Sequence, residues 1–341
     1  MKQRHLLSGC YLLLFIGLIS PPVASAVDIT QQLHYPVRNS SRRPSREQAD
    51  TLRRIGEQQY ASGFADKAVT SSLEALEIYH AIGDLQAQGV IYDLLARSYI
   101  QLNRLKEGEN ALRLRLAIAR DTKDFQSQIF GLNNISTLLL QKGEPVAAGK
   151  TLEEALKIAR HVKNIEGEGL SLSNLGLVAA RVGDYNQAIK LYETALNFRR
   201  QTGDKIGEAN TLNNLGDAYL EARNYPDTIG TYGAAMRIAE NGRDRTNQLR
   251  AIDGLVIAHS SVGRYQRAFD LLQQRLIISQ ELQNLREELK SLESYAHLYE
   301  QLSDYPTARN FYERAITLAR TLADHKREMQ LTNQLTQILK Q

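Results

Sequence analysis

The chain has 341 residues, of which 43% are apolar and 23% charged, with seven prolines and a single cysteine, Cys10. This composition excludes intrinsic disorder and collagen-like structure and is typical of a globular protein. The formal net charge of +4 at pH 7 is too small for the basic surface of a nucleic-acid-binding protein, so we expect no nucleic-acid partner.

Residues 1–26 have the pattern of a signal peptide. Lys2 and Arg4 precede a mostly apolar run, and Ala24-Ser25-Ala26 supplies the small residues of a cleavage site. The alternative is an uncleaved membrane anchor, but the apolar run is shorter than the roughly 20 residues that cross a bilayer. We therefore predict export into a periplasm or an equivalent lumen, or secretion, and no integral membrane span in the mature form.

Residues 27–44 contain Pro36 and Pro44 among asparagine, serine and arginine residues. Such a composition lacks the apolar periodicity of a packed element, and it predicts a linker. The remaining residues, 45–341, are predicted to form one repetitive region.

This region repeats with a period of 40 residues. Aspartate or asparagine recurs once in every period, at Asp84, Asp124, Asn164, Asp204, Asp244, Asn284 and Asp324. Such side chains accept hydrogen bonds from free backbone N–H groups, so each predicts the start of a helix. The period divides the region into seven units and a capping helix: 45–84, 85–124, 125–164, 165–204, 205–244, 245–284, 285–324 and 325–341.

Each unit is predicted to contain two helices. Between successive caps, apolar residues recur at spacings of three and four, which indicates two amphipathic helices of about 16 residues. Prolines fall only at the start of the second helix, where they remove no hydrogen bond. The turns between the two helices are predicted at Gly143-Glu144, Gly183-Asp184, Arg223-Asn224, Gly263-Arg264 and Ser303-Asp304.

Large and small apolar residues form columns in register across the units. We predict that these columns make the core and that helices cross closely at the small residues. The large column of the first helices is Leu95, Ile135, Leu175, Leu215 and Leu255, and the small column of the second helices is Ala68, Ala148, Ala188, Ala268 and Ala308.

The sequence resembles the tetratricopeptide repeat family over residues 45–341. Leu175, Gly176, Ala188, Tyr192 and Ala195 match its Leu-Gly, Ala, aromatic, Ala pattern, although the unit of 40 residues is longer than the usual 34. The resemblance is to a long-repeat form in an exported protein of bacterial type. It implies an all-α, right-handed superhelical solenoid of about seven helix-turn-helix repeats plus a C-terminal capping helix.

No arrangement of residues in the sequence indicates catalysis, a cofactor or a metal. Only His259 and His297 lie in nearly matching phases, one unit apart, and they lack a third ligand. These features favour ordinary groove or surface histidines over a zinc site. Nucleophile-elbow and phosphate-loop motifs are absent. We therefore predict a non-enzymatic protein that needs no cofactor.

The candidate binding residues are polar residues of the first helices, because stacked hairpins place these helices on the inner wall. Side-chain amides donate and accept, which suits the backbone of an extended peptide. The resemblance nominates Asn134, Asn174 and Asn214 for this contact; the alternative is that the amides brace the stack. The full amide line is Asn133, Asn134, Asn174, Asn213 and Asn214.

Charged residues complete the predicted groove. Arg54 and Arg97 make its start basic, whereas Asp217, Asp253 and Glu293 make the later units acidic. This pattern predicts an extended ligand whose basic part lies toward the C-terminal units.

The sequence thus predicts an exported, non-enzymatic scaffold or adaptor that binds a partner protein or an extended peptide. The alternative is a peptide-sensing regulatory protein that changes its superhelix when the peptide binds. Self-association is compatible with this prediction. The sequence does not name the ligand, the partner or the process, because one backbone-reading groove serves many functions.

Overall fold

The computed structural model describes residues 45–339, and over this range the chain forms fifteen α-helices and no strand. The predicted signal peptide and linker fall outside the described residues. The helices are α2 (Arg46–Ala61), α3 (Ala65–Ala81), α4 (Leu85–Gln101), α5 (Leu105–Asp121), α6 (Phe125–Gln141), α7 (Pro145–His161), α8 (Ile165–Arg181), α9 (Tyr185–Thr202), α10 (Lys205–Glu221), α11 (Tyr225–Asn241), α12 (Arg245–Ser261), α13 (Tyr265–Glu281), α14 (Leu285–Gln301), α15 (Tyr305–Thr321) and α16 (His325–Ile338).

The helices form seven hairpins followed by the single helix α16. In each hairpin the even-numbered helix, here called the first helix, precedes the odd-numbered second helix. The predicted caps hold the starts of the first helices: Asp84 accepts from the backbone N–H of Ala87 at 3.0 Å, and Asp204 accepts from that of Gly207 at 2.8 Å. Equivalent bonds cap the helices at Asp124, Asn164, Asp244, Asn284 and Asp324.

The turns between the two helices contain a residue with left-handed backbone. Glycine takes this role at Gly143 and Gly183, whose φ angles are +80° and +84°, but Arg223 and Ser303 adopt the same region at +58° and +60°. Non-glycine residues enter it at some energetic cost. The second helix begins two residues later, so the predicted turns are confirmed.

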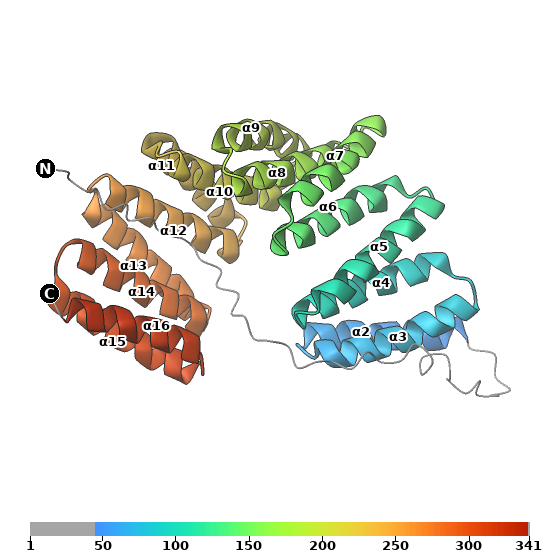
Figure 1. The fold of residues 1–341 in the computed structure, drawn as a ribbon, viewed down its shortest axis with the longest axis horizontal. Helices are drawn as coiled ribbons and strands as arrows, with labels where there is room; N and C mark the ends of the chain where they lie inside the picture. Colours follow the sequence, from blue (N-terminus) through green and yellow to red (C-terminus); the bar gives the residue numbers. More distant parts are fainter. Residues whose placement is uncertain (1–44, 340–341) are drawn as a thin grey trace, which may run out of the picture. The chain divides into compact units, whose positions relative to one another are not determined.

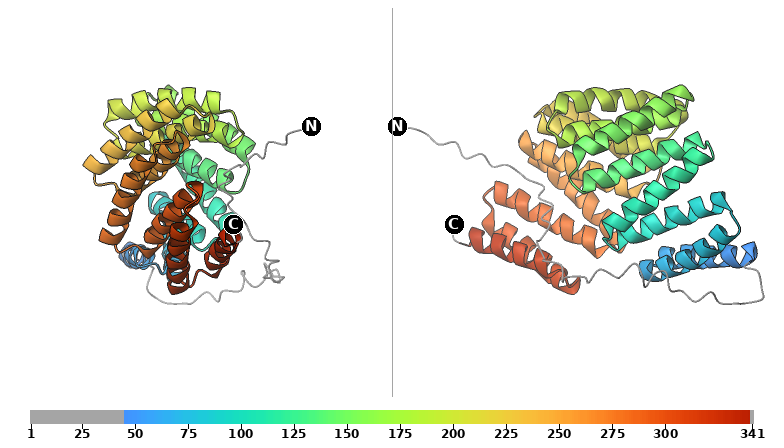
Figure 2. Two further views of the ribbon diagram at one scale, coloured as in Figure 1. Left: turned by 90° about the vertical axis from the view of Figure 1, so that its left-hand side faces the viewer. Right: turned by 45° about the vertical axis from the view of Figure 1, so that its right-hand side comes forward.

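Successive hairpins pack side by side in a row (Figures 1 and 2). In the middle of the row the first helices α6, α8 and α10 lie on the inner side, and the second helices α7, α9 and α11 lie on the outer side (Figure 1). First helices α6 and α8, and likewise α10 and α12, also pack closely on each other, whereas α4 and α6, α12 and α14, and α14 and α16 make little direct contact. The predicted all-α solenoid of helix pairs is confirmed.

The predicted small columns form the centre of the core. Ala68, Ala148, Ala188, Ala268 and Ala308 are all fully buried, and Tyr192 and Tyr232 are each only 1% exposed. The aromatic rings of these tyrosines pack against glycines of the neighbouring first helices. Small residues therefore mark the close helix crossings, as expected from the sequence.

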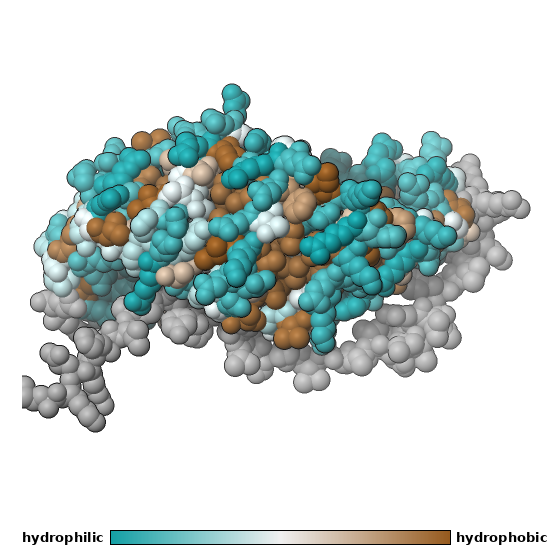
Figure 3. Space-filling view, turned by 90° about the horizontal axis from the view of Figure 1, so that it is seen from above, coloured by the Kyte–Doolittle hydropathy of each residue, from teal (hydrophilic) through white to brown (hydrophobic). Residues whose placement is uncertain are grey.

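The outer surface is mixed in character. Seen from above, hydrophilic side chains cover most of the helices, with apolar patches between them (Figure 3). Across residues 45–339, no helix has both the length and the apolar character needed to cross a membrane.

Candidate binding surface

The five predicted amides differ sharply in their exposure. On α6 and α10, Asn133 is 1% exposed and Asn213 is fully buried, whereas Asn134 is exposed. Asn174 and Asn214 are half-buried. The expectation that both neighbouring positions face the groove is therefore wrong for Asn133 and Asn213, because one residue step turns the side chain by about 100° around the helix.

The buried amides join neighbouring first helices. Asn133 donates from Nδ2 to the Ser171 hydroxyl at 3.0 Å and accepts at its Oδ1 from Asn174 at 2.8 Å. Asn213 donates to the backbone carbonyl and to the side-chain oxygen of Asn247, both at 3.1 Å. These bonds connect α6 to α8 and α10 to α12, so Asn133, Asn174 and Asn213 brace the stack.

Asn134 is the one of the five amides whose side chain makes no hydrogen bond within residues 45–339. This side chain is exposed on α6. Asn214 is different, because its Oδ1 accepts from Arg250 at 2.6 Å. A ligand on the inner surface therefore finds a ready donor and acceptor at Asn134.

Arginines of the same chain pair with the three predicted acidic residues. Asp217 on α10 accepts from Arg250 at 2.5 Å and from the hydroxyl of Tyr232. Burial first, and then the nearby Asp217 carboxylate, raise the pKa of the Tyr232 hydroxyl well above its ordinary value, so this group remains a donor. The side chain of Asp217 is thus already engaged by α12 and α11.

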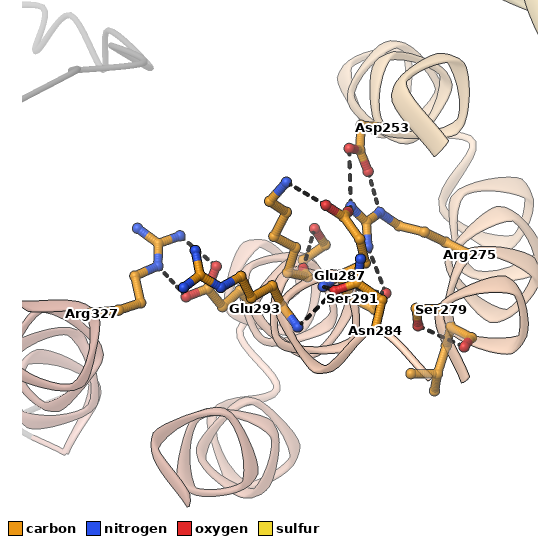
Figure 4. Close-up of polar contacts among 12 residues, drawn as sticks. Asp253, Arg275, Ser279, Asn284, Glu287, Ser291, Glu293 and Arg327 are labelled. Atoms are coloured by element: carbon orange, nitrogen blue, oxygen red, sulfur yellow. Dashed lines mark hydrogen bonds and ion pairs between the residues drawn. The ribbon is translucent and has the colours of Figure 1, made fainter. Parts of the chain in front are cut away.

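The other two carboxylates are also neutralised (Figure 4). Asp253 bonds to Arg275 on α13, and Glu293, which is 4% exposed, bonds to Arg327 on α16 through both of its oxygens. Ion pairs thus offset the charge of the three residues predicted to make the later units acidic, and their contact with a basic part of a ligand stays a prediction. The sequence pattern missed these ion pairs because the partner arginines lie on other helices, 22 and 34 residues away.

Arg275 forms the most heavily bonded of these pairs. Its side chain is fully buried and also donates to the backbone oxygen of Glu287, to the Glu287 carboxylate and to the Ser291 hydroxyl. Burial alone lowers the pKa of Arg275, but the hydrogen bond and the charge of Asp253, together with Glu287, outweigh this and raise it. The guanidinium is therefore charged and fully satisfied.

The two predicted basic residues at the start of the row, Arg54 and Arg97, form no ion pair within the described residues. Arg97 on α4 is exposed and stacks over the ring of Tyr60 at 5.0 Å, a favourable cation–π contact. Within the described part of the chain, neither Arg97 nor Arg54 has a carboxylate partner. Both side chains are exposed; that they meet a ligand stays a prediction.

A cavity that the sequence did not reveal lies next to Arg97. It has a volume of about 610 Å³ and lies between α4, α5 and α6. Asn134, Thr137 and Arg97 line it, together with the ion pair of Asp93 and Arg115, whose atoms are 3.1 Å apart. The signal for it was Arg115, which occupies a position that holds alanine in most other units.

The two histidines weighed as zinc ligands have other surroundings. His259 is buried, and burial, followed by the charges of Arg264 and Arg267, lowers its pKa. His297 is exposed and lies 3.0 Å from the Tyr312 hydroxyl. From residue 45 to residue 339, no group of three or more histidine, cysteine or acidic residues is placed to hold a metal ion.

Sequence models of the tetratricopeptide repeat match this chain in several places. Three overlapping matches cover residues 128–201, 167–241 and 207–281, and a further one covers residues 291–326. These segments span the hairpins from α6 onward. No curated protein sequence is detectably similar to the chain.

Solved structures share the fold at low sequence identity. A Signal Transduction ATPase with Numerous Domains that carries a tetratricopeptide repeat sensor, from Pyrococcus horikoshii, is 18% identical with a TM-score of 0.63; the match covers 84% of this chain and 44% of that protein, so the present chain spans less than half of it. The apo form of RapI is 13% identical, with a TM-score of 0.61 and coverage of 81% and 99%. BtubC from P. vanneervenii is 20% identical, with a TM-score of 0.55 and coverage of 67% and 92%.

Proposed function

We propose that this chain of tetratricopeptide repeats is a non-enzymatic scaffold or adaptor that binds an extended peptide or a partner protein along the inner, first-helix surface. The repeats from residue 128 onward match the family, and its stacked hairpins provide a long recognition surface. What carries the proposal is that two polar side chains lining a cavity on this surface are not neutralised or saturated within the described chain. The amide of Asn134 has no hydrogen-bond partner there, and the guanidinium of Arg97 has no carboxylate partner there.

The groups suit peptide recognition for a chemical reason. A free side-chain amide pairs with both the N–H and the C=O of an extended backbone, while a cavity beside it takes a side chain. Most other polar residues of the first helices already bond within the stack, as Asn133, Asn213 and Glu293 do. Binding is therefore expected to centre on α4 and α6.

The test is photo-crosslinking of the purified protein to components of its native extract. We expect Asn134→Ala to reduce the captured material severalfold, whereas Asn197→Ala, an exposed asparagine on the second helix α9, leaves it unchanged. Equal capture by both variants and the unsubstituted protein would place binding elsewhere. A protein that captures nothing would contradict the adaptor function itself.

Export is part of the proposal and rests on residues 1–26 of the sequence, where a charged start, an apolar run and a small-residue cleavage site follow in order. Fusion of these residues to a reporter enzyme that is active only outside the cytoplasm tests it. We expect activity from the fusion and none when the apolar run is interrupted by arginines. Activity that is indifferent to these arginines would contradict export.

A peptide-sensing regulatory protein is the second candidate, and the packing of the first helices favours it. The first helices α4 and α6 pack on each other less closely than α6 and α8 do, and the cavity lies between them, so we expect the row to bend there. The similar ATPase from Pyrococcus horikoshii is described as carrying a tetratricopeptide repeat sensor. Small-angle scattering distinguishes the candidates: a change in radius of gyration on peptide addition supports the sensor, and an unchanged curve supports the adaptor.

A further inference from the structure

The cavity between α4, α5 and α6 belongs to a pattern that occurs twice in the chain. Arg115 pairs with Asp93, and four units later Arg275 pairs with Asp253 at the same two positions of the repeat. In the other units this second-helix position is alanine: Ala75, Ala155, Ala195, Ala235 and Ala315. We call the two places the Arg115 layer and the Arg275 layer.

The Arg275 layer is filled by the chain itself. Glu287, in the first turn of α14, places a carboxylate oxygen 2.9 Å from the Arg275 guanidinium, and Ser291 one turn later accepts from it at 2.7 Å (Figure 4). With Asp253, the guanidinium thus has two carboxylates and is fully buried.

The Arg115 layer lacks the second carboxylate. Ser127 stands where Glu287 stands in the other layer, and Gly131 stands where Ser291 does. Arg115 therefore bonds only to Asp93 at 3.1 Å and to the Ser127 hydroxyl at 2.5 Å, and its side chain is 17% exposed. Within residues 45–339 its Nη1 has no acceptor.

The space left by these smaller residues is the cavity of about 610 Å³. Its apolar walls include Phe130, which replaces Lys290 of the other layer, together with Ile100 and Leu112. Its charged lining consists of two arginines, Arg97 and Arg115, and one carboxylate, Asp93. The lining therefore favours a ligand that combines a negative charge with an apolar group.

We propose that this cavity binds an acidic side chain of an extended peptide together with a neighbouring apolar side chain. The peptide carboxylate pairs with the Arg115 guanidinium as the Glu287 carboxylate pairs with that of Arg275, and Arg97 supplies a second positive charge in the cavity lining. The apolar side chain packs against Phe130. This assignment rests on the proposed function and specifies the peptide that the inner surface selects.

The Arg275 layer supplies the decisive variant. Ser127→Glu builds the missing carboxylate into the chain at the position of Glu287, so we expect it to occupy Arg115 and to exclude an acidic peptide. It should also raise the melting temperature, because it adds a buried ion pair and an acidic residue in the first turn of α6. Ser127→Gln is the matched control, with the same size and no charge.

The probe is a phage-displayed library of random dodecapeptides selected on the immobilised protein. We expect enrichment of peptides in which aspartate or glutamate adjoins a large apolar residue. The enriched peptide, labelled with fluorescein, should lose roughly tenfold in affinity when its acidic residue becomes the amide. Ser127→Glu should weaken binding to a similar extent, and Ser127→Gln should have little effect.

Four results would overturn the assignment while leaving the adaptor function intact. The first three are enriched peptides without an acidic residue, equal weakening by Ser127→Glu and Ser127→Gln, and full competition by 3-phenylpropionate, which would make a small carboxylic acid the occupant. Sedimentation that shows a dimer broken by Thr137→Trp, at the cavity edge, would make a second copy of the chain the occupant. If no peptide is enriched and nothing crosslinks in the native extract, the proposed function itself fails.

Discussion

The ring of Tyr192 occupies the space that a side chain at Gly176 would need. An ideal Cβ on Gly176 would lie 2.6 Å from the ring, and Tyr192 is only 1% exposed. The glycine in the middle of α8 is therefore required by its neighbour on α9. The same relationship joins Gly216 to Tyr232, at 2.7 Å.

This relationship predicts whether each of two glycine substitutions raises or lowers the free energy of unfolding. Gly176→Ala gains about 1 kcal/mol in helix propensity but crowds a buried ring, which costs about 1–3 kcal/mol, so it should destabilise or at best leave stability unchanged. Gly230→Ala in α11 meets no atom within 4 Å and should stabilise by up to about 1 kcal/mol. Urea unfolding measures both. A larger gain from Gly176→Ala than from Gly230→Ala would contradict the packing argument.

The buried Arg275 side chain predicts a large loss of stability when it is removed. Arg275→Ala removes the partner of Asp253 and Glu287 and leaves a cavity, so we expect it to destabilise the protein by about 3 kcal/mol, the lower end for breaking a buried pair, because Asp253 is 40% exposed. Adding Asp253→Asn recreates the asparagine and alanine pair found at Asn213 and Ala235. Part of the stability should return in the double variant, as measured by thermal unfolding; a purely additive loss would show that the two residues are independent.

The buried carboxyl of Glu208 predicts that the stability of the folded protein depends on pH. Burial alone raises the pKa of this carboxyl, but its bonds to Arg200 at 2.8 Å and Lys205 at 3.0 Å outweigh burial and lower the pKa below 4.5. Because the folded-state pKa is depressed, the stabilisation is complete above the unfolded-state pKa and is lost as the pH falls through the folded-state pKa.

The corresponding variant is Glu208→Gln. We expect it to destabilise by about 1–3 kcal/mol at pH 7, and the difference from the unsubstituted protein should shrink as the pH falls below 4.5. Unfolding free energies measured from pH 3 to pH 7 test this. A difference that grows on acidification would show that the carboxyl titrates in the opposite sense.

Substitutions of two neighbouring asparagines on α6 should distinguish a role in stability from a role in binding. Asn133→Ala removes a buried group that bonds to Ser171 and Asn174, so it should cost about 1–3 kcal/mol. Asn134→Ala changes an exposed group and should alter stability by less than about 0.5 kcal/mol. Chemical unfolding of the two variants is the measurement, and equal losses would mean that Asn134 also braces the stack.

The helix boundaries and the core could be predicted from the sequence because they depend on local chemistry. The carboxylate of Asp204 caps the helix that begins at the next residue by accepting from the N–H of Gly207, three residues later, and Ala188 is small because two helices cross there. Both signals recur every 40 residues, so each unit repeats and reinforces the same information.

The binding surface was predicted less well because it depends on rotation and on distant partners. Asn133 and Asn134 are adjacent in sequence, but one is buried and the other exposed. The charge of Glu293 is cancelled by Arg327 on α16, at the two repeat positions where Asn213 bonds to Asn247 two units earlier; the residue columns alone did not indicate that these positions meet. A residue that departs from the repeat pattern, such as Arg115 or Arg275 at a position that otherwise holds alanine, is the sequence signal for an ion pair between helices.

The sparse packing between α4 and α6, beside the cavity, should shorten the lifetime of the backbone hydrogen bonds there. Since contacts in such a row join only near neighbours, the hairpins before and after this place can open separately. Amide protons should therefore exchange with deuterium at different rates on its two sides, and protection should be lowest in α16 at the end of the row.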